Sequence, residues 1–264
     1  MKDILRDALR GFLRRMSGPP PNGGSPNEAA TPRDAEPVGG PQERGDLPSG
    51  PPPIEMLQIA DRVVTEEELV FPRGPRVYLG HNATFERCRL HFNSRPDCVT
   101  LARSRFIDCD IHADRPMKKA IWTACEVTGC RFHGRFQDND FGHWPGRHLG
   151  GMAGSIADCD FTDTELHFIR FFGCDITSLR LPGWPCFALI DPRQAFEPIR
   201  RMANPPEWLA YFDAIHGEMA RQEDPCLTAM TYHAPTLAKW LSRKVQVTEA
   251  DLRAFVEGYS GAVL

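Results

Sequence analysis

The sequence has no cysteine in its first 87 residues, no uninterrupted apolar run of 18 residues and no large excess of one charge sign. The odd count of 9 cysteines and the lack of a signal-peptide pattern indicate a reducing compartment. The lack of a long apolar run argues against a membrane-spanning helix. A net charge of −4 provides no positive field to hold a nucleic-acid backbone. We therefore expect a cytoplasmic protein, free or peripheral to a membrane or assembly, with no nucleic-acid partner.

Signatures of catalysis and of metal binding are also missing. The sequence contains no G-x-S-x-G elbow, Walker loop, H-E-x-x-H helix or dinucleotide fingerprint. No C-x₂-C pair occurs, so the cysteines lack the spacing of a zinc site. Cys98, Cys186 and Cys226 are the candidates for reactive thiols, because the other cysteines follow a structural repeat. We expect no catalytic residue, no metal and no cofactor, and hence a protein that is not an enzyme.

Residues 1–18 are predicted to form an amphipathic helix. The expected docking residues are an apolar stripe of Ile4, Leu5, Leu9, Phe12 and Leu13 and a basic face with Arg6, Arg10 and Arg14. A helix of this length is marginal in water, so it needs a surface: the protein's own folded part, an anionic membrane face or a groove on a protein partner. Residues 19–53 hold 11 of the 24 prolines and are predicted to be a disordered linker, which favours an external target.

A repeat of 21 residues follows in the middle of the chain. Three kinds of residue keep this spacing, the cysteines Cys88, Cys109 and Cys130, the large apolar residues Leu90, Ile111 and Phe132, and the histidines His91, His112 and His133. Farther along, large apolar residues recur every five positions: Ile156, Phe161, Leu166, Phe171, Ile176 and Leu181. A five-residue period fits neither a helix nor a long strand, so we expect the chain to turn a corner every five residues.

These pentads resemble the pentapeptide-repeat family, in which a small residue precedes a large apolar one by two positions, often with Asp or Asn between them. Cys109-Asp110-Ile111, Cys159-Asp160-Phe161 and Cys174-Asp175-Ile176 carry this pattern. The resemblance covers about residues 79–182 and implies a right-handed, four-sided parallel β-helix with both motif positions inside. Because the first coils have 21 residues, a three-sided helix remains open for residues 79–141.

The expected fold class is therefore mainly β: a right-handed parallel β-helix of pentapeptide-repeat type, with a disordered N-terminal linker and an α-helical C-terminal region. Residues 54–78 are predicted to be an N-terminal cap, because the edges of a β-helix need cover. The β-helix spans residues 79–185, and residues 186–264 form a helical C-terminal cap or module. Asn204-Pro205 is the expected start of one helix, and Thr248 with Asp251 resembles a capping box for another.

The positions within each repeat also predict which residues lie inside the β-helix and which face solvent. Cysteine at the small position is expected to act as a small hydrophobic residue of the interior. The positions between the inward residues are charged and are expected to stack as a ladder: Arg89, Asp110, Arg131, Asp160 and Asp175. His91, His112 and His133 are expected to form a column on one outer face, either a solvated row or a contact strip sensitive to pH or to metals.

We expect a non-enzymatic protein-interaction scaffold or adaptor, a rigid β-helix tethered to a docking or membrane-surface amphipathic helix. The expected partner is a protein, and residues 1–18 add a peripheral membrane contact as an option. One alternative is a β-helix enzyme acting on glycans, which needs a groove lined by clustered carboxylates. Another is a DNA-mimic inhibitor of a topoisomerase, which needs a strongly acidic face.

Overall fold

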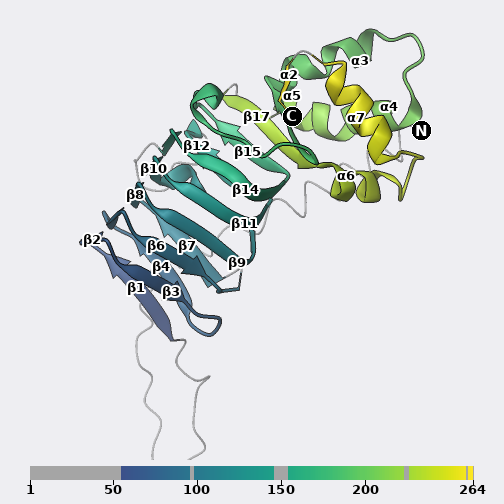
Figure 1. Cartoon of the computed structure of the whole chain (residues 1–264). Helices are drawn as coiled ribbons and strands as arrows, with labels where there is room; N and C mark the ends of the chain where they lie inside the picture. The colour runs from purple at the N-terminus through teal and green to yellow at the C-terminus, as the bar shows by residue number, and fades with distance from the viewer. Residues whose placement is uncertain (1–54, 96–97, 146–153, 223–225, 260, 264) are drawn as a thin grey trace, which may run out of the picture. The chain divides into compact units, whose positions relative to one another are not determined.

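The computed structural model describes residues 55–95, 98–145, 154–222, 226–259 and 261–263. The fold is mainly β, with 43% strand, which confirms the expected fold class. A parallel β-solenoid of about four turns occupies residues 56–137, and a few helices follow toward the C-terminus (Figure 1). The helix predicted over residues 1–18, its eight docking residues and the linker over residues 19–53 lie outside the described residues.

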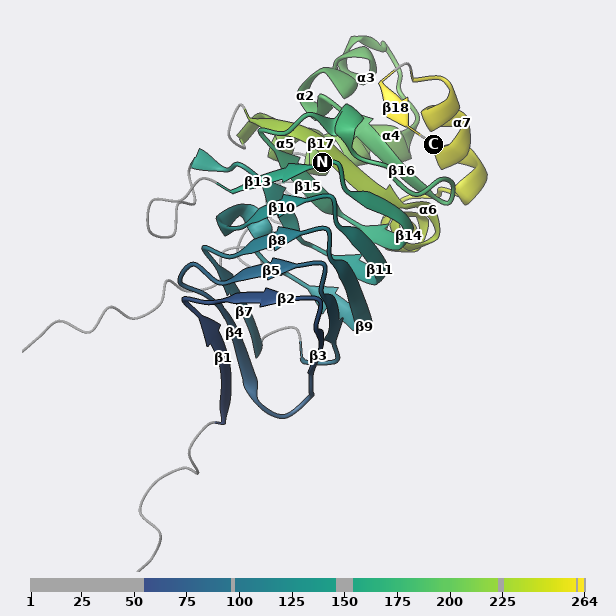
Figure 2. The same cartoon turned by 60° about the vertical axis from the view of Figure 1, so that its left-hand side comes forward.

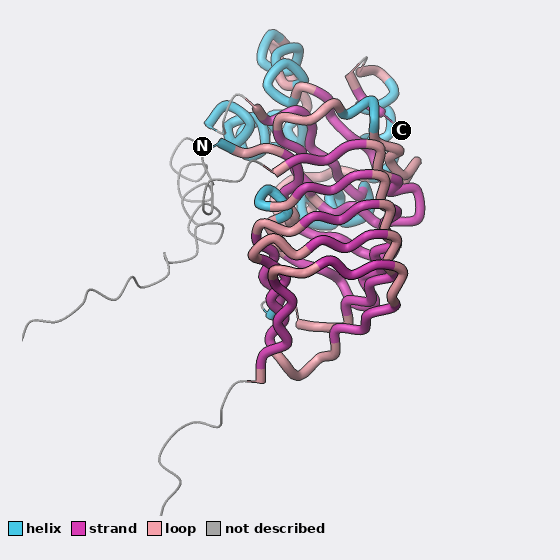
Figure 3. Tube along the Cα trace, turned by 90° about the vertical axis from the view of Figure 1, so that its left-hand side faces the viewer, coloured by secondary structure: helices cyan, strands magenta, loops and turns pink. Residues whose placement is uncertain are grey.

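Three parallel sheets form the sides of the solenoid (Figures 2 and 3). The first contains β1 (Met56–Ala60), β4 (Arg76–Gly80) and β7 (Val99–Ala102). The second contains β2 (Val63–Thr65), β5 (Thr84–Glu86), β8 (Arg105–Ile107), β10 (Glu126–Thr128) and β13 (Ser155–Ala157). The third contains β3 (Glu68–Phe71), β6 (Arg89–Phe92), β9 (Asp110–Lys118), β11 (Arg131–Gln137) and β14 (Asp160–His167). Equivalent residues pair directly between β5 and β8 and between β6 and β9, so a property that repeats along these coils becomes a row in space.

The solenoid begins earlier than the sequence suggested. Residues 54–78, expected to be a cap, carry the strands of the first coil, β1, β2 and β3. Val64 pairs with Phe85, and Leu69 with Leu90, each pair 21 residues apart. The segment is therefore a coil in phase with the repeat, and the prediction of a separate cap was wrong.

The first two coils have three sides, so in the second coil the structure agrees with the three-sided alternative and not with the four sides that the resemblance implied. The loop over residues 72–75 stands where a fourth strand would run in the first coil, and residues 93–95 follow β6 without forming a strand in the second. Pro72 and Pro75 have no N–H to donate to a ladder. From the third coil the missing side appears, because β9, β11 and β14 are longer and each carries two separated inward residues. In β11 these are Phe132 and Phe136, both fully buried, with a register shift between Gly134 and Phe136.

The later coils continue the first sheet's side through a short 3₁₀ turn, η2 (Trp122–Ala124), and then through β12 (Asp140–Gly142) and β15 (Ile169–Phe172). The last coil follows the pentads, since its inward residues Ile156, Phe161, Leu166 and Phe171 are all buried. A second 3₁₀ turn, η4 (Ile176–Ser178), begins a further coil, in which Arg180 pairs with Asp160. The coil length has therefore shortened to 20 residues at this end.

The corner between the second and third sheets uses the left-handed backbone region in every coil. The residues there have φ between 52° and 67°: Glu66, Arg87, Asp108, Gly129 and Asp158. Only glycine adopts this region without steric cost, and Asp tolerates it better than most side chains. At Gly129 a Cβ atom would collide with Oδ1 of Asp108 in the coil before. The corner is therefore tight as well as left-handed.

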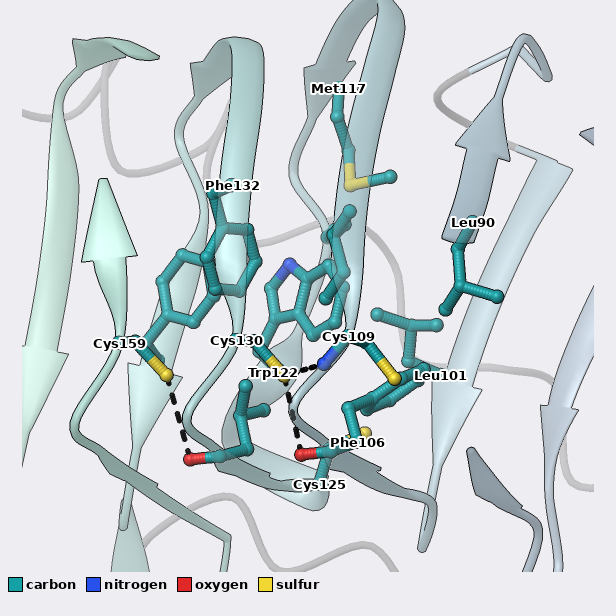
Figure 4. Packing of buried hydrophobic residues seen from close by; sticks show 14 of the residues in the cluster. Leu90, Leu101, Phe106, Cys109, Met117, Trp122, Cys125, Cys130, Phe132 and Cys159 are labelled. Atoms are coloured by element: carbon teal, nitrogen blue, oxygen red, sulfur yellow. Dashed lines mark hydrogen bonds between the residues drawn. The ribbon is translucent and has the colours of Figure 1, made fainter. Parts of the chain in front are cut away.

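The interior is a column of rings and thiols (Figure 4). Phe85 stacks on Phe106 with ring centroids 5.1 Å apart, and Phe132 stacks on Phe161 at 4.3 Å. Cys88, Cys109, Cys130 and Cys159 fill the small position beside them and are at most 1% exposed. Each thiol lies 3.3–3.8 Å from a backbone carbonyl oxygen of the coil before. These four cysteines form no disulfide and are buried, which fits their expected role as small interior residues.

The C-terminal region closes the last coil with strands as well as helices. Its strands are β16 (Cys186–Ile190), β17 (Leu227–His233) and β18 (Ala262–Val263). Strand β17 runs antiparallel to β15, so it covers the open edge of the solenoid, and β16 then pairs with β17. The helices are α2 (Pro192–Ala195), α3 (Glu197–Arg201), α4 (Glu207–Phe212), a π-helical turn η5 (Asp213–Gly217), α5 (Glu218–Gln222), α6 (Ala234–Leu241) and α7 (Glu249–Glu257). None of the helices in the described ranges is long and apolar enough to cross a membrane.

The helix signals were partly right. Thr248 and Asp251 form the predicted capping box, with the Asp251 N–H donating to Oγ1 of Thr248 at 3.2 Å and the Thr248 N–H donating to the Asp251 carboxylate at 2.8 Å. Helix α4 begins at Glu207, after Pro206, and so starts two residues later than Asn204-Pro205 indicated. The three strands of this region were not foreseen.

Candidate functional site

The three repeat histidines form a stacked ladder on the outer face of the third sheet. His91 on β6, His112 on β9 and His133 on β11 are paired directly across the parallel strands. Their ring centroids lie 4.5 and 4.3 Å apart, with interplanar angles of 11° and 7°. Neighbouring parallel strands are about 4.8 Å apart, so in-register imidazoles must stack. The structure thus brings together the three residues that the sequence singled out as a possible contact strip.

Carboxylates flank the two ends of this ladder. Nδ1 of His91 lies 3.2 Å from Oδ1 of Asp114, and its Nε2 lies 3.6 Å from Glu68. His133 lies 3.7 Å from Asp110 on one side and 3.7 Å from Asp163 on the other. The side chains of His91 and His133 are 23% and 25% exposed, so each can reach a partner while keeping its acidic neighbours.

The central histidine differs from the outer two. Nε2 of His112 is buried and has no hydrogen-bond partner among the described residues. Burial is the main cause that lowers the pKa of His112, and the neighbouring imidazoles of His133 and His91 lower it further. The central ring is therefore held neutral, and it stacks on the rings of His91 and His133 on its two sides.

A row of charges that alternates in sign runs beside the histidines. Paired positions along the sheet carry Glu68, Arg89, Asp110, Arg131, Asp160 and Arg180 in this order. The last pair, Arg180 and Asp160, is 3.2 Å apart. Asp175, expected to belong to this row, instead caps η4 by accepting a hydrogen bond from the Thr177 N–H at 2.9 Å. We call this row together with His91, His112 and His133 the histidine face.

A groove adjoins the histidine face where β9, β11 and β14 bend. Its volume is about 430 Å³. The charged lining comes from both signs: Asp114, Arg115, Arg135, Asp163 and Glu165. Gly134 lies at the bend with φ of 95°, and a Cβ atom there would collide with the carbonyl oxygen of Ala113. The bend therefore creates a hollow with charged side chains in its lining beside an otherwise regular surface.

One cluster that sequence analysis missed has the donor atoms of a metal site. Among the described residues, Glu165, His167 and His233 form a group of three whose ligand atoms all lie within 4.8 Å of one another. Glu165 and His167 come from β14, and His233 ends β17. His233 has no counterpart in the repeat, so no periodicity in the sequence could place it beside β14.

The three cysteines outside the repeat register differ in their burial. Cys186 on β16 is buried, and burial raises the pKa of its thiol. Cys98 and Cys226 are half-buried in the segments before β7 and β17. In the repeat itself, complete burial raises the pKa of Cys125 to about 12. A protonated, enclosed thiol is a poor nucleophile.

Comparisons with known proteins add no constraint. No family model, no curated protein and no solved structure matches the chain. Functional interpretation therefore rests on the geometry of the histidine face, the groove and the junction between β14 and β17.

Proposed function

We propose that this chain is a non-enzymatic protein-interaction scaffold whose β-solenoid engages a protein partner through the histidine face. The observation that carries the proposal is the stacked ladder of His91, His112 and His133 beside the charge row. This surface offers polar groups at the regular spacing of the coils, with the outer histidines accessible. Polar, aromatic and charged groups on a fixed frame favour specific protein contacts.

The rigidity of the frame supports the same role. Strands β6, β9 and β11 are hydrogen-bonded on both sides within the third sheet, and the rings beneath them are fully buried. A partner that binds this face pays little for ordering it, because the side chains are already stacked. The charge row alternates in sign, so it does not reproduce the continuous negative charge of a DNA duplex. This favours a protein partner over the DNA-mimic alternative.

We further propose that the coil from residue 154 onward is a pentapeptide repeat and that residues 1–18 form the docking helix of an adaptor. The first part is supported by buried small and large pairs, Cys159 with Phe161 and Thr164 with Leu166. It is also supported by the hydrogen bond of 2.7 Å from the Phe161 N–H to the carbonyl oxygen of Arg180, close to one 20-residue coil away. The second part rests on the apolar stripe and basic face of the sequence alone.

Affinity capture with the full chain as bait tests the proposal. The bait variant His91→Gln, His112→Gln, His133→Gln removes the ladder, and the double variant Arg105→Gln, Glu126→Gln removes an exposed ion pair on the second sheet as a matched control. We expect a direct partner, re-tested with purified protein, to bind the ladder variant at least about tenfold more weakly and the control unchanged. Equal binding by both variants, each with unchanged circular dichroism, would rule out the histidine face.

The second candidate is an enzyme acting on glycans, and one observation favours it. The groove has the carboxylates Asp114, Asp163 and Glu165 in its lining, and paired carboxylates hydrolyse glycosidic bonds. Against it, Arg135 and His167 hold Glu165, and hydrogen bonds from them outweigh burial and lower its pKa, which is unfavourable for a general acid. A glycan-cleavage screen decides, since an enzyme must cleave a substrate and lose that activity in Asp114→Asn, Asp163→Asn.

A further inference from the structure

The end of the solenoid carries an unassigned cluster of ligating side chains. Glu165 and His167 are two residues apart on β14, so both project from the same face of the strand. His233 is the last residue of β17, and Thr231 on the same strand accepts a hydrogen bond from the Ile169 N–H through its hydroxyl oxygen at 3.3 Å. That contact fixes β17 against the chain that follows β14. The imidazoles of His167 and His233 are thereby stacked, with ring centroids 4.4 Å apart.

We propose that Glu165, His167 and His233 bind a divalent transition-metal ion, with Zn²⁺ as the preferred metal, and that the ion joins the last solenoid coil to the C-terminal region. This site is independent of the partner-binding role of the histidine face.

The donor set selects the class of metal. Two imidazole nitrogens and one carboxylate oxygen are a common three-residue set for Zn²⁺, with a water molecule as fourth ligand. Ca²⁺ and Mg²⁺ prefer shells made of oxygen, which two imidazoles do not provide. The ligand atoms lie within 4.8 Å of one another, whereas ligands of tetrahedral zinc are about 3.3–3.5 Å apart. Metal binding therefore requires the three ligand atoms to move closer together than they lie in this structure.

Burial and hydrogen bonds orient the two imidazoles of the cluster. His167 is only 7% exposed, and Nε2 lies 3.1 Å from Oε2 of Glu165, so two of the three ligands already converge. Nδ1 of His233 lies 3.0 Å from Oγ1 of Thr236, which orients that ring from behind.

The guanidinium of Arg135 competes with a metal ion for this site. The guanidinium of Arg135 on β11 contacts Oε2 of Glu165 at 2.7 Å through Nε and through an NH₂ group. A metal ion must displace this guanidinium or use the other carboxylate oxygen. Removal of Arg135 should therefore tighten metal binding, whereas removal of a ligand should weaken it. A merely structural ion pair between Arg135 and Glu165 predicts no effect on metal affinity in either direction.

Calorimetric titration of the full chain with ZnCl₂, after chelator treatment, tests the proposal. We expect a saturable site with a dissociation constant of about 10 µM or tighter, weakened at least about tenfold in His233→Gln and in Glu165→Gln. Arg135→Gln should bind Zn²⁺ more tightly than the wild type. The matched control is His81→Gln, an exposed histidine outside both the cluster and the histidine face, which should leave this site unchanged.

Two further readouts separate this site from the nine cysteines and from misfolding. Co²⁺ bound at the cluster should give visible bands without the near-ultraviolet thiolate band that cysteine ligation produces. Stoichiometric ZnCl₂ should raise the melting temperature of the wild type and of Arg135→Gln, with no rise in His233→Gln. Unchanged affinity in His233→Gln, Glu165→Gln and Arg135→Gln, or no saturable binding by the folded wild type, would overturn the proposal.

Discussion

The ion pair between Asp140 on β12 and Arg170 on β15 is the best place to test how the last coils are held together. Nε of Arg170 donates to Oδ1 of Asp140 at 2.7 Å, and an NH₂ group donates to Oδ2 at 2.8 Å. Both side chains are 6% exposed. The guanidinium also lies over the rings of Trp144, at 5.1 Å, and Phe172, at 5.5 Å. Removing either charge therefore takes a close charged partner from the other in a dry site.

The perturbation is a double-mutant cycle of Asp140→Asn, Arg170→Met and the combined variant. Each single change leaves one buried charge without its partner, which costs about 3–5 kcal/mol of unfolding free energy. The combined variant removes both charges of the pair, so it should cost less than the sum of the single changes by about 2–3 kcal/mol. The loss arises from desolvation of the remaining ion, and the stacking of Arg170 on Trp144 and Phe172 only adds to it.

Urea unfolding at pH 7, followed by far-ultraviolet circular dichroism, measures this coupling. The control cycle uses Arg105 and Glu126, which are 2.9 Å apart on the second sheet with side chains 54% and 37% exposed. Solvent screens that pair, so its coupling should stay below about 1 kcal/mol. The reasoning fails if the Asp140–Arg170 coupling is no larger than that of the control pair.

Three further changes probe the column, its corner and the C-terminal region. Phe132→Ala empties a position that four other rings surround. Loss of this fully buried ring should lower the free energy of unfolding in urea by about 3–5 kcal/mol, whereas Phe132→Leu should lower it by less than about 2 kcal/mol. Gly129→Ala, which forces a Cβ against Asp108 at positive φ, should cost more than about 1 kcal/mol, and Asp108→Gly should relieve part of this in the double variant. Complete burial lowers the pKa of His216 to about 3. The unfolded chain therefore binds its proton first, and stability falls as pH drops below about 6.5, by about 2 kcal/mol between pH 7 and 5. Urea unfolding of His216→Leu at both pH values should show a smaller loss than the wild type by this amount, and an equal loss would contradict the burial of a neutral ring.

Periodic features could be predicted from the sequence because each repeats a local rule. The inward positions Cys109 and Ile111, the row of His91, His112 and His133, and the corner beside Asp108 all follow from the 21-residue spacing and parallel pairing. The first coil was missed although Val64 precedes Phe85 by 21 residues, because that coil lacks the cysteine that marks the others. The capping box of α7 was visible because it needs only two residues three positions apart.

The number of sides depended on more than the repeat. A coil of 21 residues can close with three strands and a loop or with four short strands, and the spacing is the same in both. Pro72 and Pro75 favour the loop in the first coil, while the bend at Gly134 lets β11 supply two sides. Coil length alone therefore does not determine the number of sides of the coil. The pairing of the strands determines it.

By itself the sequence determined the parallel solenoid, its interior of thiols and rings, and the histidine row. These features follow from the spacing of the repeat and from the side of the strand on which each residue lies. The tertiary structure decided how the column ends: β17 returns antiparallel to β15, with Ile169 paired to Thr231 across 62 residues. That pairing also brings His233 to Glu165 and His167. Contacts that occur once, between segments far apart in the chain, leave no period in a single sequence, and they form only when the folded coil presents an edge to cover.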